Sequence, residues 1–204
     1  MYDVVIIGCG VVGAAAAYQL SRYQLKTLIL EASNDVANGT TKANSAIIHA
    51  GYDPEPGTKM ARLNVEGVKM AKELCEKLSV ERREIGSFVL AFSQEEMATV
   101  RELFDRGNKN GVPGLRVLTG EEVRAMEPAI SGEVVGALYA PSAAIVSPWE
   151  FCLALAETAV RNGVELRLSS PVTAIEKREG SFLLRTASGD VEARYVVNAA
   201  GVES

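Results

Sequence analysis

The stretch that decides the fold of this chain is Tyr2-Asp-Val-Val-Ile-Ile-Gly8-Cys-Gly10-Val-Val-Gly13, at the start of the sequence. The apolar run at residues 4–7 predicts a buried strand, and it leads directly into a Gly-x-Gly-x-x-Gly turn. Small residues at 14–20 predict a helix that lies close to a sheet, and residues 27–30 predict a second apolar strand. This order is typical of the β-α-β unit that binds dinucleotides.

Each glycine of this turn has a separate physical role. Gly8 allows the tight turn out of the strand, Gly10 lets the backbone approach a diphosphate, and Gly13 lets the helix lie close to the sheet. The helix begins at Val11 and Val12, where unpaired N–H groups and a partial positive charge favour phosphate. Glycine turns also occur for packing alone, so this structural alternative stays open.

Glu31 ends the second strand, 18 residues after Gly13. A carboxylate at this position, beside Ala32, can accept hydrogen bonds from ribose hydroxyls. The same charge would repel a 2′-phosphate, which argues against an NADP-type cofactor. The fingerprint alone is compatible with both FAD and NAD.

Composition excludes several other classes of protein. The 204 residues are 48% hydrophobic and carry a net charge of −5, without a run of Lys and Arg, so nucleic acid is not expected as a partner. No positively charged leader and no apolar stretch of membrane-spanning length is visible. Cys9, Cys75 and Cys152 lie far apart, which predicts reduced, buried thiols in a cytoplasmic protein, with neither disulfides nor a metal site.

Residues 32–57 predict a long polar loop with a short strand at 46–49, and loops of this length are usually functional. Residues 58–78 predict an amphipathic helix. Its apolar positions, which are expected to be buried, are Met60, Leu63, Gly67, Met70, Leu74 and Leu78. Capping residues at Ser93, Thr119 and Ser147 predict three further helix starts.

The remaining periodic segments predict strands at residues 85–92, 115–118, 134–139, 164–168, 172–177, 182–186 and 192–197. The predicted fold class is α/β: a Rossmann-like domain with an antiparallel meander, interrupted by a smaller α+β insertion. We expect residues 1–84 and 147–204 to form the cofactor-binding domain, and residues 85–146 part of a substrate or cap domain.

Two features favour FAD over NAD. An antiparallel meander at 172–194 stands where an NAD-binding dehydrogenase domain would have another crossover helix. The next strand ends in Asn198-Ala-Ala-Gly201, whose small residues can pass close beneath a nucleotide. Together with the stretch Gly39-Thr-Thr-Lys-Ala-Asn-Ser-Ala-Ile-Ile-His-Ala-Gly51, the chain resembles the D-amino-acid-oxidase-like family of FAD-dependent oxidoreductases. Its glycerol-3-phosphate dehydrogenase branch is the most similar, with the L-2-hydroxyglutarate oxidase branch nearby.

The resemblance implies a set of FAD-binding residues. The three glycines of the turn would face the diphosphate and Glu31 the ribose. Val172 would lie near the adenine, with Ala200 and Gly201 beneath the nucleotide. The loop from the diphosphate toward the flavin ring would be lined by Thr40, Thr41, Asn44 and Ser45. The alternative is that these four residues only satisfy hydrogen bonds within a polar loop.

His49, the only histidine, is the candidate base that would take the substrate hydroxyl proton while hydride passes to flavin. A half-buried histidine bonded to backbone is the alternative. Lys42 is a candidate for orienting an anionic substrate or stabilising reduced flavin, and a solvated loop lysine is its alternative.

The implied activity is oxidation of a small anionic hydroxy compound: glycerol 3-phosphate first, L-2-hydroxyglutarate or an amino acid as alternatives. Electrons would leave to a quinone, a carrier protein or oxygen. Family members are much longer, so we expect the chain to be an N-terminal part, with the substrate-binding arginines in the missing part. A truncated flavin-binding module without activity of its own is the other alternative. The expected location is cytoplasmic, or peripheral to the membrane in the full-length protein.

Overall fold

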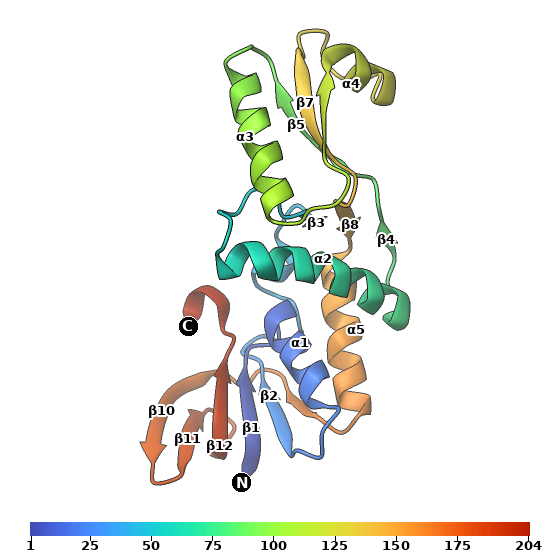
Figure 1. Ribbon diagram of the computed structural model, residues 1–204. Coiled ribbons are helices and arrows are strands. Elements are labelled where there is room, and N and C mark those ends of the chain that lie inside the picture. Colours follow the sequence, from blue (N-terminus) through green and yellow to red (C-terminus); the bar gives the residue numbers. More distant parts are fainter. The chain divides into compact units, whose positions relative to one another are not determined.

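The computed structural model describes all 204 residues, and the chain divides into two compact units (Figure 1). Unit 1 comprises residues 1–45 and 147–204, and unit 2 comprises residues 46–146.

Unit 1 is built on a six-stranded sheet in the order β10-β11-β12-β1-β2-β9. The strands are β1 (Tyr2–Ile7), β2 (Thr27–Leu30), β9 (Glu165–Arg167), β10 (Val172–Arg178), β11 (Ser181–Thr186) and β12 (Val191–Asn198). Strands β12, β1, β2 and β9 are parallel, whereas β10, β11 and β12 form an antiparallel meander. The predicted α/β class, with its Rossmann-like core and meander, is confirmed.

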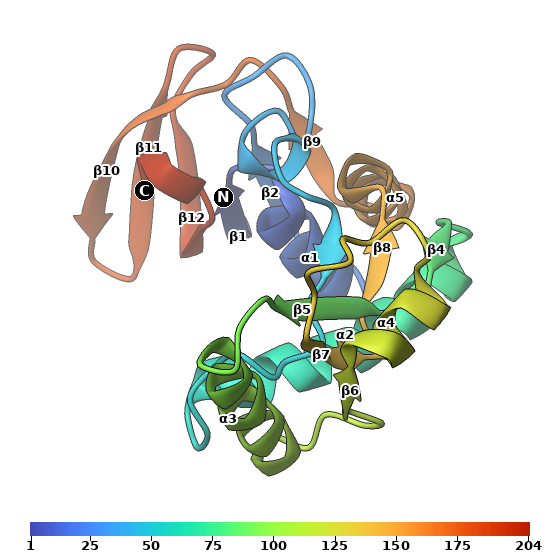
Figure 2. The ribbon, with the colours of Figure 1, turned by 90° about the horizontal axis from the view of Figure 1, so that it is seen from above.

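Two helices of unit 1, α1 (Val11–Leu20) and α5 (Pro148–Arg161), lie side by side (Figure 2). Helix α1 buries small residues, which permits a close approach to the sheet. The start of α5 is as predicted: Ser147 accepts a hydrogen bond from the Glu150 N–H, and Pro148 occupies the first turn.

The apolar strands of unit 1 are covered on a second side as well. Val5, Leu28 and Leu30 pack in one cluster with Leu184 and Val191 of the meander. Strands buried in this way read as continuous apolar runs rather than alternating ones, which explains the composition of residues 4–7 and 27–30.

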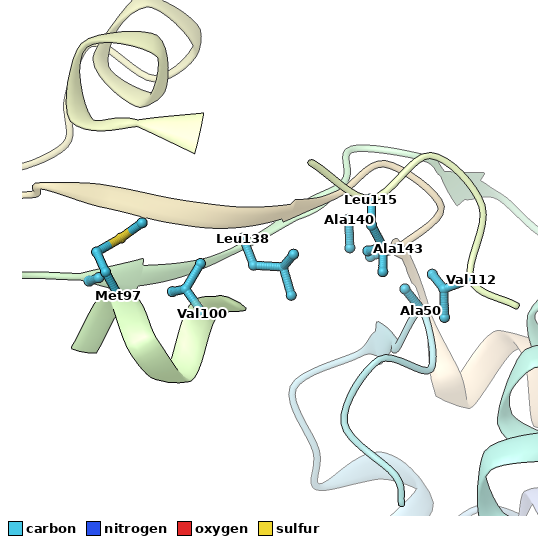
Figure 3. Packing of buried hydrophobic residues seen from close by; sticks show 9 residues of the cluster. Ala50, Met97, Val100, Val112, Leu115, Leu138, Ala140 and Ala143 are labelled. Carbon is cyan, nitrogen blue, oxygen red and sulfur yellow. The ribbon is translucent and has the colours of Figure 1, made fainter. Parts of the chain in front are cut away.

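Unit 2 contains two three-stranded antiparallel sheets, ordered β3-β8-β4 and β5-β7-β6. Its elements are β3 (Ile47–Ile48), α2 (Lys59–Leu78), β4 (Arg82–Arg83), β5 (Ser87–Ala91), α3 (Glu96–Lys109), β6 (Arg116–Thr119), α4 (Gly120–Met126), β7 (Gly136–Ala140) and β8 (Ala144–Val146). Met97 and Val100 of α3 pack against Leu138 of β7, and Ala50 joins the same cluster (Figure 3).

Residues 46–84 pack with unit 2, whereas the sequence analysis assigned them to the cofactor-binding domain. The physical reason is strand pairing, because β3 and β4 both pair with β8, the last strand of unit 2 in the sequence. Pairing over about 60 to 100 residues leaves no periodic signal in the sequence.

The predicted buried stripe of α2 is wrong at three of its six positions, whereas Gly67, Leu74 and Leu78 are half-buried. Met60, Leu63 and Met70 are 69%, 54% and 49% exposed, respectively. The helix instead buries an adjacent face, which includes Ala61 and Cys75. No helix of the structure is both long enough and apolar enough to cross a bilayer.

Candidate functional site

A cavity of about 510 Å³ opens in unit 1 where β1, β2 and β12 end. The carboxyl ends of parallel strands are where α/β sheets bind their ligands. The residues that line it are Ile7, Gly8, Gly10, Val11, Val12, Leu30, Glu31, Ala32, Ser33, Asn38, Gly39, Thr40, Thr41, Asn44, Val172, Ala199, Ala200, Gly201, Val202 and Glu203. Segments far apart in the sequence therefore meet at one cavity.

The turn after β1 tolerates only glycine at two positions. Gly8 has φ +93°, and a Cβ added there would lie 2.6 Å from the carbonyl oxygen of Ala199. A Cβ added at Gly13 would lie 2.0 Å from the carbonyl oxygen of Gly8. Gly13 does not line the cavity, so its role in the structure is to bring α1 against the turn.

The N-terminus of α1 points its first amides at this site. Gly10 is the N-cap and provides no side chain, and the Val11 N–H donates to Thr41 Oγ1 at 3.0 Å. The N–H groups of Val12 and Gly13 follow in the first turn, where amides have no acceptor within the helix. Unpaired amides with the helix dipole behind them suit a diphosphate.

The carboxylate of Glu31 is fixed by two backbone amides. Its Oε2 accepts from the Cys9 N–H at 2.6 Å, and its Oε1 accepts from the Ser33 N–H at 2.8 Å. A carboxylate oxygen has two lone pairs, so each oxygen can accept one further hydrogen bond at the cavity wall. This arrangement suits a diol such as a ribose, as the sequence predicts.

The loop after β2 is fastened to the glycine turn. The Ala37 N–H donates to the Cys9 carbonyl at 3.0 Å, and the short 3₁₀ turn η1 (Thr40–Lys42) carries the buried Thr41. The Asn44 amide donates to the carbonyl oxygens of Thr40 and Thr41 at 3.2 and 2.8 Å. Thr40, Thr41 and Asn44 line the cavity, but Ser45 does not.

Two buried thiols belong to the turn and its surroundings: Cys9 lies within the turn, and Cys152 of α5 contacts it. The Cys152 thiol donates to the Cys9 carbonyl at 3.4 Å. Burial raises the pKa of Cys9 to about 12 and that of Cys152 to about 11, so both are neutral at physiological pH. All three cysteines are free, and no group of three or more His, Cys, Asp or Glu residues is arranged to hold a metal.

The two candidate catalytic residues have different settings. Lys42 does not line the cavity, and its ammonium donates to the Asn38 side chain. His49 belongs to unit 2, where it follows β3. It is exposed, which differs from the half-buried, backbone-bonded histidine that the sequence left as the alternative to a catalytic base.

Several cavity-lining residues were not predicted from the sequence. Ile7 and Leu30 are the last residues of their strands, and the position of the motif could have identified them. Ala199, next to the predicted Ala200, also lines the cavity and could have been identified from its position. The polar loop gave no particular signal for Ser33, Asn38 and Gly39, and the 3₁₀ turn η2 (Gly201–Glu203) gave none for Val202 and Glu203.

Comparison with known proteins agrees with this geometry. Residues 3–204 match the family described as FAD dependent oxidoreductase. A glycerol 3-phosphate dehydrogenase from Caloramator mitchellensis is 50% identical over 202 residues, which cover 99% of this chain and 42% of the relative. The human mitochondrial L-2-hydroxyglutarate dehydrogenase is 30% identical over 217 residues, covering 100% of this chain and 46% of that protein.

A solved structure of L-alpha-glycerophosphate oxidase from Mycoplasma pneumoniae, dithionite-reduced and with FAD bound, superposes with a TM-score of 0.93 at 32% identity. The match covers 98% of this chain and 54% of that one. This chain thus spans about half the length of the relatives it matches. The resemblance seen in the sequence is confirmed, and the chain belongs to the family of FAD-dependent oxidoreductases.

Proposed function

We propose that the cavity of unit 1 binds FAD, and that the chain carries the cofactor-binding part of an enzyme that oxidises glycerol 3-phosphate. The observation that carries this proposal is the convergence of the glycine turn, the fixed Glu31 carboxylate and the polar loop around one cavity. The solved structure that superposes on 98% of this chain has FAD bound.

The residues of the cavity fit this cofactor. The Val12 amide would take the diphosphate, and the Glu31 carboxylate would accept from the adenosine ribose hydroxyls. Val172 and Ala200 offer apolar contact for the adenine. Thr40 and Asn44 carry neutral polar groups suited to flavin oxygens, and we propose the same role for Ser45, next to Asn44 in the chain but not part of the cavity lining.

When bound, FAD supplies a hydride acceptor, which side chains cannot provide. The task left to the chain is to remove the substrate's hydroxyl proton. We assign it to the imidazole of His49, since histidine exchanges a proton near neutral pH. Lys42 is the second candidate, for the anionic group of the substrate, although its ammonium is engaged with Asn38.

The choice of substrate rests on the relatives. The 50% identity to a glycerol 3-phosphate dehydrogenase favours glycerol 3-phosphate, with L-2-hydroxyglutarate or an amino acid as alternatives from the same family. The electron acceptor would be a quinone, a carrier protein or oxygen. The three free, buried thiols support a reducing compartment, the cytoplasm.

The test begins with the purified chain, its visible absorbance and its titration with FAD and with NAD. We expect retained flavin absorbance, and a Glu31→Gln variant should bind FAD at least tenfold more weakly. The carboxamide replaces one acceptor oxygen by an NH₂ group, which would face the N–H of Cys9 or Ser33. Glu73→Gln, on the exposed side of α2, is the matched control and should bind normally.

Binding of NAD in place of FAD would overturn the cofactor assignment. A colourless chain that binds neither would overturn the claim that unit 1 alone holds the cofactor, and would support the alternative of an incomplete module. In the flavin-loaded protein extended to the length of its relatives, anaerobic glycerol 3-phosphate should bleach the flavin. If only L-2-hydroxyglutarate bleaches the flavin, it would replace glycerol 3-phosphate as the proposed substrate. In a His49→Asn variant, the substrate should bleach the flavin at least a hundredfold more slowly.

A further inference from the structure

Helix α1 is capped by a residue that is not its neighbour in sequence. Ser, Thr, Asn and Asp usually cap a helix with their own side chain, but the N-cap here is Gly10, which has none. The hydroxyl comes from Thr41, 31 residues further along the chain: its Oγ1 accepts from the Val11 N–H at 3.0 Å. Thr41 is only 8% exposed, so this bond is sheltered from water.

Gly10 and Thr41 are matched in size. A Cβ added at Gly10 would lie 3.1 Å from Thr41 Oγ1, which is tighter than ordinary van der Waals contact. Beyond the residues next to Gly10 in the chain, no other heavy atom lies within 4 Å of that Cβ position. The absence of a side chain at Gly10 therefore leaves the space that the Thr41 hydroxyl occupies.

The capping bond uses only part of the hydrogen-bonding capacity of the hydroxyl. Threonine has one O–H donor and two lone pairs, and one lone pair takes the Val11 N–H. Thr41 is also one of the residues that line the cavity. Because Val11 is already satisfied, the first-turn amide left for a ligand in the cavity is that of Val12.

We propose that Thr41 is a positioning residue that couples the loop at 32–45 to the N-terminus of α1, so that both sides of the cofactor site are held in place before FAD arrives. The proposal rests on the proposed function of the cavity. Its physical basis is that an ordered site binds without first having to order the loop, so removal of the cap lowers the apparent affinity.

The experiment compares Thr41→Val, which keeps the shape and loses the acceptor, with Thr41→Ser, which keeps the hydroxyl. Thr40→Val is the control for the exchange measurement only, since Thr40 lies in the same turn without capping α1. The first readout is hydrogen exchange of the Val11 amide in the FAD-free protein. The second is the dissociation constant of FAD, followed by flavin fluorescence.

Loss of a helix cap corresponds to about a fivefold change in equilibrium. We therefore expect Thr41→Val to speed Val11 exchange by about fivefold and to weaken FAD binding by about the same factor. Thr41→Ser should restore both to within about twofold, and Thr40→Val should leave Val11 exchange unchanged. If Thr41→Val does not fold, Thr41→Ala replaces it in both measurements.

If the Val11 amide of Thr41→Val exchanges as slowly as that of the wild type, the claim that Thr41 caps α1 is overturned. Faster exchange with unchanged FAD affinity would overturn the coupling between cap and site. A wild-type chain that does not bind FAD would contradict the proposed function instead, and the exchange measurement would still test the cap.

Discussion

Replacing Gly13 by alanine tests how closely α1 presses on the glycine turn. The added Cβ would lie 2.0 Å from the Gly8 carbonyl oxygen and 3.1 Å from its carbon. Ordinary contact begins near 3.4 Å, so helix and turn would have to separate by about 1.4 Å at this point. Both partners are backbone, so no side chain can rotate to relieve the overlap.

Overpacking of this kind costs about 1–3 kcal/mol, and backbone overlap lies at the upper end of that range. Alanine in a helix recovers about 1 kcal/mol relative to glycine. We expect a net loss of about 2 kcal/mol, which lowers the melting temperature of a chain of this size by about 4–8 °C. FAD affinity should fall as well, because the displaced turn moves Gly8 at the cavity wall.

The assay is thermal unfolding followed by the fluorescence of Trp149, the only tryptophan, which reports unit 1 from helix α5. Gly67→Ala is the control: Gly67 lies within helix α2, and a Cβ there meets no atom within 4 Å. That variant should gain up to about 1 kcal/mol by circular dichroism. A Gly13→Ala protein as stable as the wild type, with unchanged FAD affinity, would refute the close packing of α1 on the turn.

Two further predictions concern the buried thiols and a loop of unit 2. Stability should fall as pH rises above 9, by up to about 1.4 kcal/mol per pH unit for each thiol: the unfolded chain releases the protons of Cys9 and Cys152, while the folded chain holds them to about pH 12 and 11. Melting curves from pH 8 to 10.5 measure this, and a Cys9→Ala variant with the wild-type slope would contradict it. Asn110→Ala should destabilise unit 2 by about 1–3 kcal/mol, because the amide donates to the carbonyl oxygens of Gly51 and Pro54 at 3.0 and 2.7 Å. Urea unfolding of this variant against Asn108→Ala, whose amide bonds only within its own helix, should show the loss for Asn110 alone.

The sequence was informative where local chemistry dictates structure. The glycine turn requires particular residues at fixed spacing, and the caps at Thr119 and Ser147 act within four residues, so both were predictable. The lining residues of the turn and of the end of β2 followed from the same motif, because the motif places the strand ends. Those of the polar loop, of β10 and of residues 199–203 were expected only from the family resemblance, or not at all. The sequence predicted less where the residues that contact each other are far apart along the chain.

Helix α2 shows why periodicity was insufficient. It has two adjacent apolar faces, and the pattern at Met60, Leu63 and Met70 could not show that the face with Ala61 is the buried one. The same holds for the cap of α1. Thr41 was expected to contact a cofactor, and its bond to Val11 depends on a loop path that no local pattern encodes.

The order of pairing around β1 has a consequence for synthesis on the ribosome. Strand β2 supplies one neighbour by residue 30, but the other neighbour, β12, is not made until residues 191–198. At typical elongation rates, the edge of β1 that later pairs with β12 stays unpaired for roughly 10–40 s. The continuous unit 2 is complete long before that. A bare apolar edge is a template for other nascent chains, so the risk of aggregation should concentrate in this interval and end when β12 emerges.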